Sequence, residues 1–408
     1  MANSKMHPFH LACALLALAL GVRTARAQDA TAFQLNVGHT GSVSMPGFAP
    51  PLKLLWKTSL PGAGLSYPLI VDGMVYVTDS AYQHKQFDGT SLFALDAATG
   101  KIKWKRFVNN AQHDPRRDTW SNATYDNGRV FMLDLYNVLN AYDAKTGKLK
   151  WSQLEDQYDV ANDGSPPTAA GGSVYMKSYS IDEANGSRQW TGFMSGTGVT
   201  SPAVGDGGMY EASECNYFKF RLTDGFPLWH TDLGCFGGLS TVPQFIDNQL
   251  FVREPTIVAP NSILDAETGA TLGTYPQIGS TMVPALYDDG ASRFMVVPNG
   301  TSLVRYDVTN PASLVSTWST TLDDTRIVSA PLVVNGYAIA GTAKGGLYVV
   351  SPQGETVWSA NLGRPVTETV ERGTSSPLSG LAAGDGIIVV PTQGDKGNKQ
   401  ALFAFGPG

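Results

Sequence analysis

The sequence is poor in the residues that carry metal, redox and strongly electrostatic chemistry. Its 408 residues include three cysteines and six histidines, with no C-x-x-C, C-x-x-C-H or H-x-x-x-H spacing. Such spacings are typical of zinc and haem sites, so we expect no metal site built on soft ligands. No G-x-S-x-G, HExxH or Walker motif occurs either, and we assign no catalytic residue. Charged residues are only 16% of the chain and the net charge is −6, which excludes a uniformly basic surface for nucleic acid.

Long hydrophobic runs are also scarce, and the one that stands out is at the N-terminus. Leu11 to Val22 is apolar, Lys5 precedes it, and Ala25-Arg26-Ala27 has the A-x-A form of a cleavage site. The alternative of a membrane anchor is disfavoured, because about 12 apolar residues are too few to span a bilayer. Residues 1–27 are therefore predicted to be a secretory signal peptide. We expect a secreted or periplasmic protein whose mature chain has no membrane span.

What the mature chain does contain is a repeat that ends in tryptophan. Ala94–Trp104 reads ALDAATGKIKW and Ala141–Trp151 reads AYDAKTGKLKW, and weaker copies follow. In the copy at Asp265 the tryptophan position holds Gly273. We expect the tryptophans that end these units to dock structurally between units: Trp56, Trp104, Trp151, Trp190, Trp229, Trp318 and Trp358.

Each copy has the signals of two β-hairpins. Asp-x-x-Thr-Gly is a tight turn in which glycine takes positive φ, and it joins two strands. A second turn, such as Asp72-Gly73 or Asn127-Gly128, precedes each copy between short apolar runs. Two hairpins form a four-stranded antiparallel sheet of about 40 residues, which is the size of one propeller blade.

The number of units predicts an all-β, eight-bladed β-propeller. Seven intervals lie between Trp56 and Trp358, and three further strands follow Trp358 without a fourth. Pairing the C-terminal strand 401–405 with the orphan strand 54–59 closes a ring of eight blades and removes two free edges. Seven blades is the alternative count, and two β-sandwich domains would explain neither the period nor the incomplete ends. We assign residues 28–51 to an N-terminal extension and residues 52–408 to the propeller domain.

The repeat resembles the tryptophan-docking repeat of the pyrroloquinoline-quinone (PQQ) propeller superfamily. That superfamily includes quinoprotein alcohol dehydrogenases, which hold PQQ over Ca²⁺ in the central channel beside a disulfide of adjacent cysteines. It also includes the non-catalytic BamB lipoprotein, whereas this leader has no lipid-attachment cysteine. Here Cys215 and Cys235 are 20 residues apart, and no carboxylate matches the Ca²⁺ ligands. We therefore expect no bound cofactor, PQQ and Ca²⁺ included, and no catalysis; a PQQ-dependent oxidoreductase is the alternative.

Cys215 and Cys235 are expected to form a disulfide. An even pair in an exported chain is a candidate bridge, and both cysteines follow strands that end on the same face of one blade. Second and fourth strands of a sheet are about 9.5 Å apart, so each cysteine must lean inward to bring the Cα atoms within about 7 Å. Two unpaired buried thiols are the alternative.

The long loops are predicted to lie on one face of the ring and the tight turns on the other. Long loops on a rigid scaffold are a usual place for binding. The predicted binding residues come from two such loops: Tyr82, His84, His113, Arg116, Arg117 and Trp120. Aromatic and arginine side chains suit contacts with a protein or a glycan, and a solvated charged loop is the alternative.

Together these observations predict a monomeric, non-catalytic binding or scaffold module for a macromolecular partner in the cell envelope or outside the cell. A quinoprotein oxidoreductase and an envelope glycan binder are the alternative functions. The sequence does not identify the partner.

Overall fold

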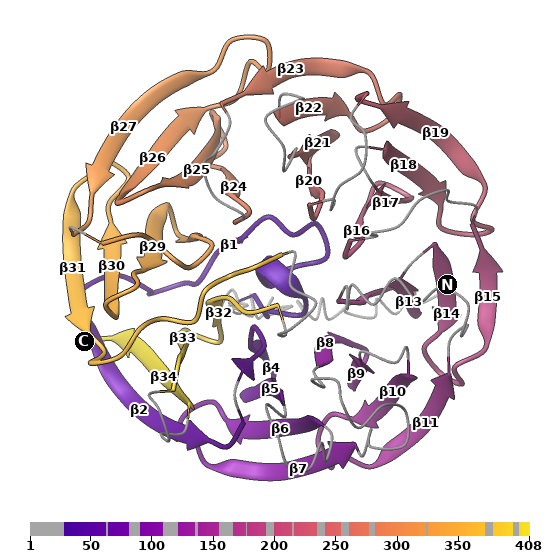
Figure 1. Ribbon diagram of the computed structural model, residues 1–408, viewed down its shortest axis with the longest axis horizontal. Coiled ribbons are helices and arrows are strands. Elements are labelled where there is room, and N and C mark those ends of the chain that lie inside the picture. The colour runs from indigo at the N-terminus through magenta and orange to yellow at the C-terminus, as the bar shows by residue number, and fades with distance from the viewer. Residues whose placement is uncertain are drawn as a thin grey trace, which may run out of the picture.

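The strands of the computed structural model are arranged radially, with the first strand of each blade near a central axis and the last on the circumference (Figure 1). The structure describes residues 28–62, 64–80, 90–108, 121–134, 138–154, 166–176, 178–192, 200–213, 216–234, 241–253, 261–276, 282–323, 325–371, 378–394 and 400–408. Each of the eight sheets contains four antiparallel strands in order from the axis outward. The prediction of an eight-bladed propeller is confirmed.

The first four blades follow one another along the chain. Blade 1 contains β4 (Leu69–Val71), β5 (Met74–Ser80), β6 (Thr90–Asp96) and β7 (Ile102–Val108), with β3 (Gly64–Leu65) beside β5. Blade 2 contains β8 (Ser121–Asp126), β9 (Arg129–Asp134), β10 (Val138–Asp143) and β11 (Leu149–Leu154). Blade 3 contains β12 (Thr168–Ala170), β13 (Ser173–Met176), β14 (Tyr179–Asp182) and β15 (Arg188–Thr191). Blade 4 contains β16 (Ala203–Gly205), β17 (Gly208–Ser213), β18 (Asn216–Arg221) and β19 (Pro227–Asp232).

The other four blades complete the ring. Blade 5 contains β20 (Gln244–Ile246), β21 (Gln249–Val252), β22 (Asn261–Asp265) and β23 (Thr271–Tyr275). Blade 6 contains β24 (Ala285–Asp288), β25 (Arg293–Asn299), β26 (Ser302–Asp307) and β27 (Val315–Thr321). Blade 7 contains β28 (Leu332–Val334), β29 (Tyr337–Gly341), β30 (Gly346–Val350) and β31 (Thr356–Asn361). Blade 8 contains β32 (Ala382–Gly384), β33 (Ile387–Thr392), β34 (Gln400–Pro407) and β2 (Leu52–Leu60).

The N-terminal strand closes the ring as predicted. β2 pairs antiparallel with β34, from Leu52 opposite Pro407 to Leu60 opposite Gln400. The first and last strands of the propeller therefore share one blade, and neither leaves an inner edge unpaired. No helix in the described part of the chain has the length and hydrophobicity to cross a bilayer. The helical content of that part is one 3₁₀ turn, η1 (Phe33–Leu35).

The turn residues explain why the strands end where they do. Asp72 and Gly73 both have positive φ, 52° and 76°, which is the type I′ geometry that suits a two-residue hairpin. In the Asp-x-x-Thr-Gly turn, Asp96 Oδ1 accepts hydrogen bonds from the backbone N–H and the hydroxyl of Thr99, at 2.9 and 2.8 Å. The same two bonds recur at Asp143 in blade 2. The aspartate and threonine of the motif thus fold the turn that carries the glycine.

The hydrophobic core lies between blades. One buried cluster joins Phe131 and Leu139 of blade 2 to Val174 and Ile181 of blade 3, with Trp151 packed against it. Buried side chains also continue inward, where a short β1 (Ser42–Val43) pairs in parallel with β28. The ring therefore has a filled centre as well as apolar seams.

Candidate functional site

The tryptophans at the ends of the units contact the next blade around the ring. Trp104 Nε1 donates a hydrogen bond to the Ala144 carbonyl of blade 2 at 3.0 Å. A Cβ atom on Gly147 would lie 2.6 Å from the Trp104 ring, so the indole needs a glycine beneath it. The corresponding bonds, at 2.8 to 3.1 Å, join Trp56 to Ala97, Trp151 to Glu183, Trp190 to Leu222 and Trp229 to Ala266.

The remaining interfaces between neighbouring blades depart from this pattern, and the residues beside the tryptophan position differ there. In blade 5 the tryptophan position is Gly273, and a Cβ there would lie 1.7 Å from the Pro311 carbonyl oxygen. The longer turn of blade 6 thus occupies the space that an indole fills elsewhere. The buried Trp318 Nε1 has no hydrogen-bond partner, and Trp358 packs edge-on against Phe405 with ring centroids 5.5 Å apart.

Residues 28–48, which we call the axial segment, lie inside the ring (Figure 1). Its carbonyl groups accept backbone hydrogen bonds at 2.7 to 2.8 Å from the innermost strands. These bonds run from Tyr125 to Thr31, from Val204 to Val37, from Phe245 to Gly38, from Leu286 to Thr40 and from Val333 to Gly41. Ala30 and Ile70 exchange two further bonds, and β1 continues the pairing along β28. The segment thus satisfies backbone donors in six blades.

The other two blades contact the axial segment as well. The His39 ring lies 3.3 Å from the Thr168 hydroxyl of blade 3. A Cβ on Gly384 of blade 8 would lie 3.2 Å from the Ala30 nitrogen, so this blade also approaches the segment closely. Sequence reasoning assigned no contacts to residues 28–51. The apolar residues Phe33, Leu35 and Val37 are the sequence signal that points to burial, although Phe33–Leu35 form a 3₁₀ turn and not a strand.

The axial segment is held in a conformation that its sequence does not favour alone. Gln34, Leu35 and His39 have positive φ values of 50°, 73° and 58°. Each such non-glycine residue costs about 1–3 kcal/mol, so the surrounding ring must hold the backbone there. Phe33 and Leu35 are buried, and the Asn36 side chain donates to the Thr40 hydroxyl at 2.7 Å.

His39 is fully buried at the centre. Its Nδ1 lies 3.3 Å from the Pro243 carbonyl oxygen, which can only accept, so Nδ1 carries the proton. Burial lowers the pKa of His39 to about 4, although the bond to Pro243 acts in the opposite direction. The imidazole is therefore neutral at pH 7, and its ring packs edge-on against Phe33 with centroids 6.0 Å apart.

A buried ion pair joins the centre to the segment between blades 7 and 8. Arg253, which follows β21, donates to Glu371 through Nη2 and to the Met282 carbonyl through Nη1 at 2.7 Å. The second carboxylate oxygen of Glu371 accepts from the Val242 N–H at 3.0 Å. The side chains of Arg253 and Glu371 are 5% and 0% exposed. Removing either partner would leave a buried charge unpaired, so this ion pair fixes the segment that leads into blade 8.

The described residues at the axis do not fit a quinone–calcium centre. Ca²⁺ takes six to eight oxygen ligands, usually with several carboxylates. Both Glu371 oxygens already accept hydrogen bonds, and the axial segment fills the middle of the ring. Among residues that the structure describes, no group of three or more His, Cys, Asp or Glu is placed to hold a metal ion. We therefore derive no catalytic step through such a centre.

Hydroxyl side chains at the starts of the inner strands satisfy neighbouring backbone groups. Ser66 Oγ accepts from the Thr78 N–H at 3.0 Å, and Ser329 Oγ accepts from the Gly341 N–H at 2.8 Å. Thr241 Oγ1 donates to the Arg253 carbonyl at 2.6 Å. All three residues are buried. Their hydrogen bonds stabilise the ends of the inner strands.

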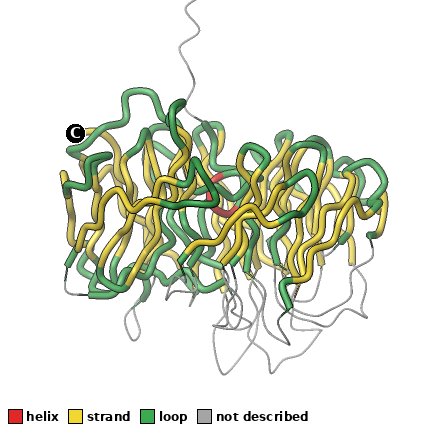
Figure 2. Tube along the Cα trace, turned by 90° about the horizontal axis from the view of Figure 1, so that it is seen from above, coloured by secondary structure: helices red, strands yellow, loops and turns green. Residues whose placement is uncertain are grey.

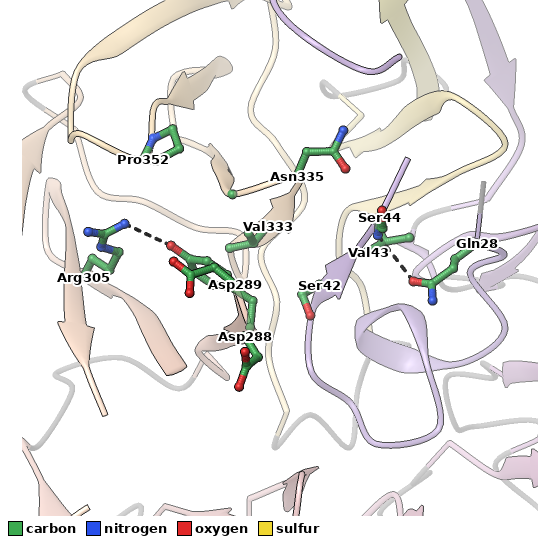
Figure 3. A pocket seen from close by; sticks show the side chains of 12 residues that line it. Gln28, Ser42, Val43, Ser44, Asp288, Asp289, Arg305, Val333, Asn335 and Pro352 are labelled. Atoms are coloured by element: carbon green, nitrogen blue, oxygen red, sulfur yellow. Dashed lines mark hydrogen bonds between the residues drawn. The ribbon is translucent and has the colours of Figure 1, made fainter. Parts of the chain in front are cut away.

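One cavity of about 480 Å³ opens on the face of the tight turns, between blades 6 and 7 (Figure 3). Asp288 and Asp289 lie on one side of it and Ser44 and Gln28 on the other. Arg305 also lines it, but its Nη1 donates to the Tyr287 hydroxyl at 3.1 Å. The cavity lining mixes polar and apolar surface, and Arg305 is hydrogen-bonded to the cavity wall.

The binding residues predicted from the sequence lie outside the described residues. These are Tyr82, His84, His113, Arg116, Arg117 and Trp120. The strands that flank them are described: β5 and β6, and β7 and β8, end or begin on the face opposite the tight turns. Seen from the side, the strands of the ring run between these two faces (Figure 2). Cys215 and Cys235 also fall outside the described residues, so their disulfide stays a prediction.

Comparisons with known proteins agree on the fold. The family model described as outer membrane protein assembly factor BamB matches residues 51–115, 91–233 and 178–398. BamB from Moraxella catarrhalis is 15% identical, with a TM-score of 0.59 over 88% of this chain and 98% of that one. Quinohemoprotein alcohol dehydrogenase from Comamonas testosteroni is 14% identical, with a TM-score of 0.68 over 93% and 80%.

A computationally designed protein, Ika8, is also similar, with 15% identity and a TM-score of 0.59 over 85% of this chain and 98% of that chain. No curated protein matches the sequence significantly. At these identities the similar structures establish the fold alone, because unrelated functions share propeller folds.

Proposed function

Because the chain belongs to the PQQ_2 family, described as outer membrane protein assembly factor BamB, we propose that it is a non-catalytic scaffold that binds a macromolecule in the cell envelope. The observation that carries this proposal is the filled centre. The axial segment and the Arg253–Glu371 pair occupy the centre of the ring, and the family resemblance implies that a quinoprotein holds its cofactor in the central channel. The surfaces that remain for recognition are the two faces and the outer wall.

The face opposite the tight turns is the binding face of this proposal. Its strand ends are joined by the longer connections, for example the nine residues between β5 and β6 and the twelve between β7 and β8. On the other face, most turns have two residues between the first and second strands and five between the third and fourth, which leaves less backbone for recognition. The leader supports export, so the partner would be met in the periplasm or outside the cell.

Site-specific photocrosslinking in the intact envelope tests the binding face. A photoreactive residue at Gln153 or Thr191, exposed near the ends of β11 and β15, should form adducts with a partner. The matched positions Asp206 and Ala291 are equally exposed in turns of the opposite face and should form none. Adducts confined to Asp206 and Ala291 would reverse the assignment of the faces, and adducts at no position would contradict the scaffold proposal.

Cofactor titration tests the absence of catalysis. PQQ and Ca²⁺ are added to the mature protein, and the quinone absorbance and dye reduction are measured. We expect neither stoichiometric binding nor turnover, because the centre is filled. A stoichiometric holo-spectrum would favour the quinoprotein oxidoreductase instead. A glycan array examines the third function, and specific retention of one glycan would replace the protein partner with a sugar.

A further inference from the structure

Three neighbouring blades repeat a pattern of lysine and aliphatic residues on the outer wall. The pairs are Lys53-Leu54 within β2, Lys101-Ile102 at the start of β7 and Lys148-Leu149 at the start of β11. Each pair ends two residues before the docking tryptophan of its strand. β2, β7 and β11 belong to blades 8, 1 and 2 and follow one another along the circumference (Figure 1). We call these six residues the basic rim.

The lysine and aliphatic side chains of the rim are open to solvent. Leu54, Ile102 and Leu149 are 52%, 47% and 47% exposed, and the three lysines are exposed as well. Each pair lies at the start of its outer strand and two residues before the docking tryptophan, so the three pairs lie at the same height on the wall. They form an arc along the end of the ring that carries the tight turns.

The charge around the rim opposes the charge of the protein. Residues 52–60, 96–108 and 143–154 contain nine Lys or Arg and two Asp, a local net charge of +7 in a chain of net charge −6. Lys103 and Lys150 pair with Asp96 and Asp143, at 3.0 and 3.1 Å. By contrast, the five other outer strands, β15, β19, β23, β27 and β31, contain no lysine and only one arginine.

Protection of exposed strand edges does not explain this distribution. Lysines on an edge strand discourage pairing with another chain. All eight outer strands are edges of their sheets, yet the lysines are confined to three adjacent ones. Exposed aliphatic residues also occur in β19, β27 and β31, at Leu228, Val315 and Val357, so the feature that distinguishes the three blades is the lysine beside the aliphatic residue. The position of the lysines therefore indicates a partner on that side of the ring.

We propose that the basic rim binds the surface of an anionic phospholipid membrane. Lysine side chains near such a surface are attracted by about 1 kcal/mol each, and aliphatic side chains beside them enter the headgroup region. A rigid ring that leans on a flat surface touches it along an arc of its rim, and three blades at equal height present such an arc. An acidic peptide added to one strand edge would instead use a single blade. This proposal is independent of the proposed scaffold function.

Vesicle flotation of the mature chain provides the test. The protein should float with vesicles that contain phosphatidylglycerol and remain unbound with phosphatidylcholine alone, and added salt should release it. The variant K53Q/K101Q/K148Q should bind at least about tenfold more weakly, because three attractive charges are lost. The control T223E/T271E/S316E lowers the net charge equally at exposed positions of blades 4, 5 and 6, on the opposite wall, and should bind like the wild type.

A second variant tests the aliphatic part. L54S/I102S/L149S keeps every charge and should also weaken vesicle binding severalfold. Circular dichroism and melting curves confirm that each variant is folded. The proposal is overturned if wild-type protein ignores phosphatidylglycerol vesicles, or if the opposite-wall control weakens binding as much as the rim variant. Binding to a polyglutamate peptide without vesicle binding would assign the rim to an acidic polypeptide and would also overturn it.

Discussion

The glycine of the Asp-x-x-Thr-Gly turn meets two requirements at once. Gly147 has a φ of 65°, and its missing side chain leaves room for the Trp104 ring of the preceding blade. Gly128 has a similar φ of 76°, but a Cβ atom there would meet nothing within 4 Å. A side chain at Gly128 would therefore strain only the backbone, whereas a side chain at Gly147 would also collide with the Trp104 ring between the blades.

Replacing each of these glycines with alanine should give different losses of stability. Gly128→Ala should lower the free energy of unfolding by about 1 kcal/mol, the cost of left-handed backbone in an L-residue. Gly147→Ala should lower it by about 2–4 kcal/mol, because overpacking against Trp104 is added. Urea unfolding measures both. Equal losses would show that the indole moves aside freely.

The burial of His39 predicts that the free energy of unfolding falls as the pH becomes acidic. Its pKa is about 4 in the folded protein and near 6.5 when exposed, so the unfolded chain takes up a proton first as the pH falls. The stability contributed by the neutral imidazole is therefore present above pH 6.5 and is lost between pH 6.5 and 4. The loss is on the order of 3 kcal/mol.

The variant His39→Gln does not titrate in this range. Urea unfolding at neutral and at acidic pH should show a smaller acid loss in the variant than in the wild type, whatever its stability at pH 7. If the free energy of unfolding fell equally with pH in both proteins, protonation of His39 would not destabilise the fold, contrary to the prediction from its burial.

At the scale of elements, β2 is the strand on which closure depends. Deleting residues 28–60 removes β2 and leaves the edge of β34 without its partner. We expect a lower melting temperature and self-association, because a long apolar edge is a template for pairing with another chain. Size-exclusion chromatography with light scattering measures the association. A truncated protein that stays monomeric and keeps its melting temperature would contradict the closure seen here.

The elements differ in how far sequence predicts them. The hairpins were predictable because turns such as Asp96–Gly100 are specified by residues a few positions apart. The axial segment was not, because its partners, such as Val204 and Phe245, lie some two hundred residues away and no local pattern identifies them. The substitution of Gly273 for tryptophan is likewise explained only by Pro311 in the next blade. The predicted binding loops and the disulfide await direct tests.

At the scale of the whole molecule, the axial segment changes how the ring should unfold. In repeat proteins each unit contacts only its neighbours, so unfolding often proceeds in parts. Here one segment contacts all eight blades, and the buried Arg253–Glu371 pair adds a second connection across the centre. We therefore expect the mature chain to unfold in one cooperative step.

Deleting residues 28–48 should remove this cooperativity while leaving β2 in place. Tryptophan fluorescence and circular dichroism should give coincident urea transitions for the mature chain and separate transitions for the truncated one. The truncated chain should remain monomeric, which distinguishes loss of the centre from loss of closure. Coincident transitions in both proteins would assign the cooperativity to the seams between blades.

The pairing of the first strand with the last has a consequence for how the chain matures. The residues made first, 28–60, find β28 and β34 only when nearly the whole polypeptide is present. A chain cut short by synthesis or proteolysis therefore keeps an open edge, and exposed edges are prone to aggregation and degradation. The two terminal strands of the ring, β2 and β34, thus protect each other only when both have been made.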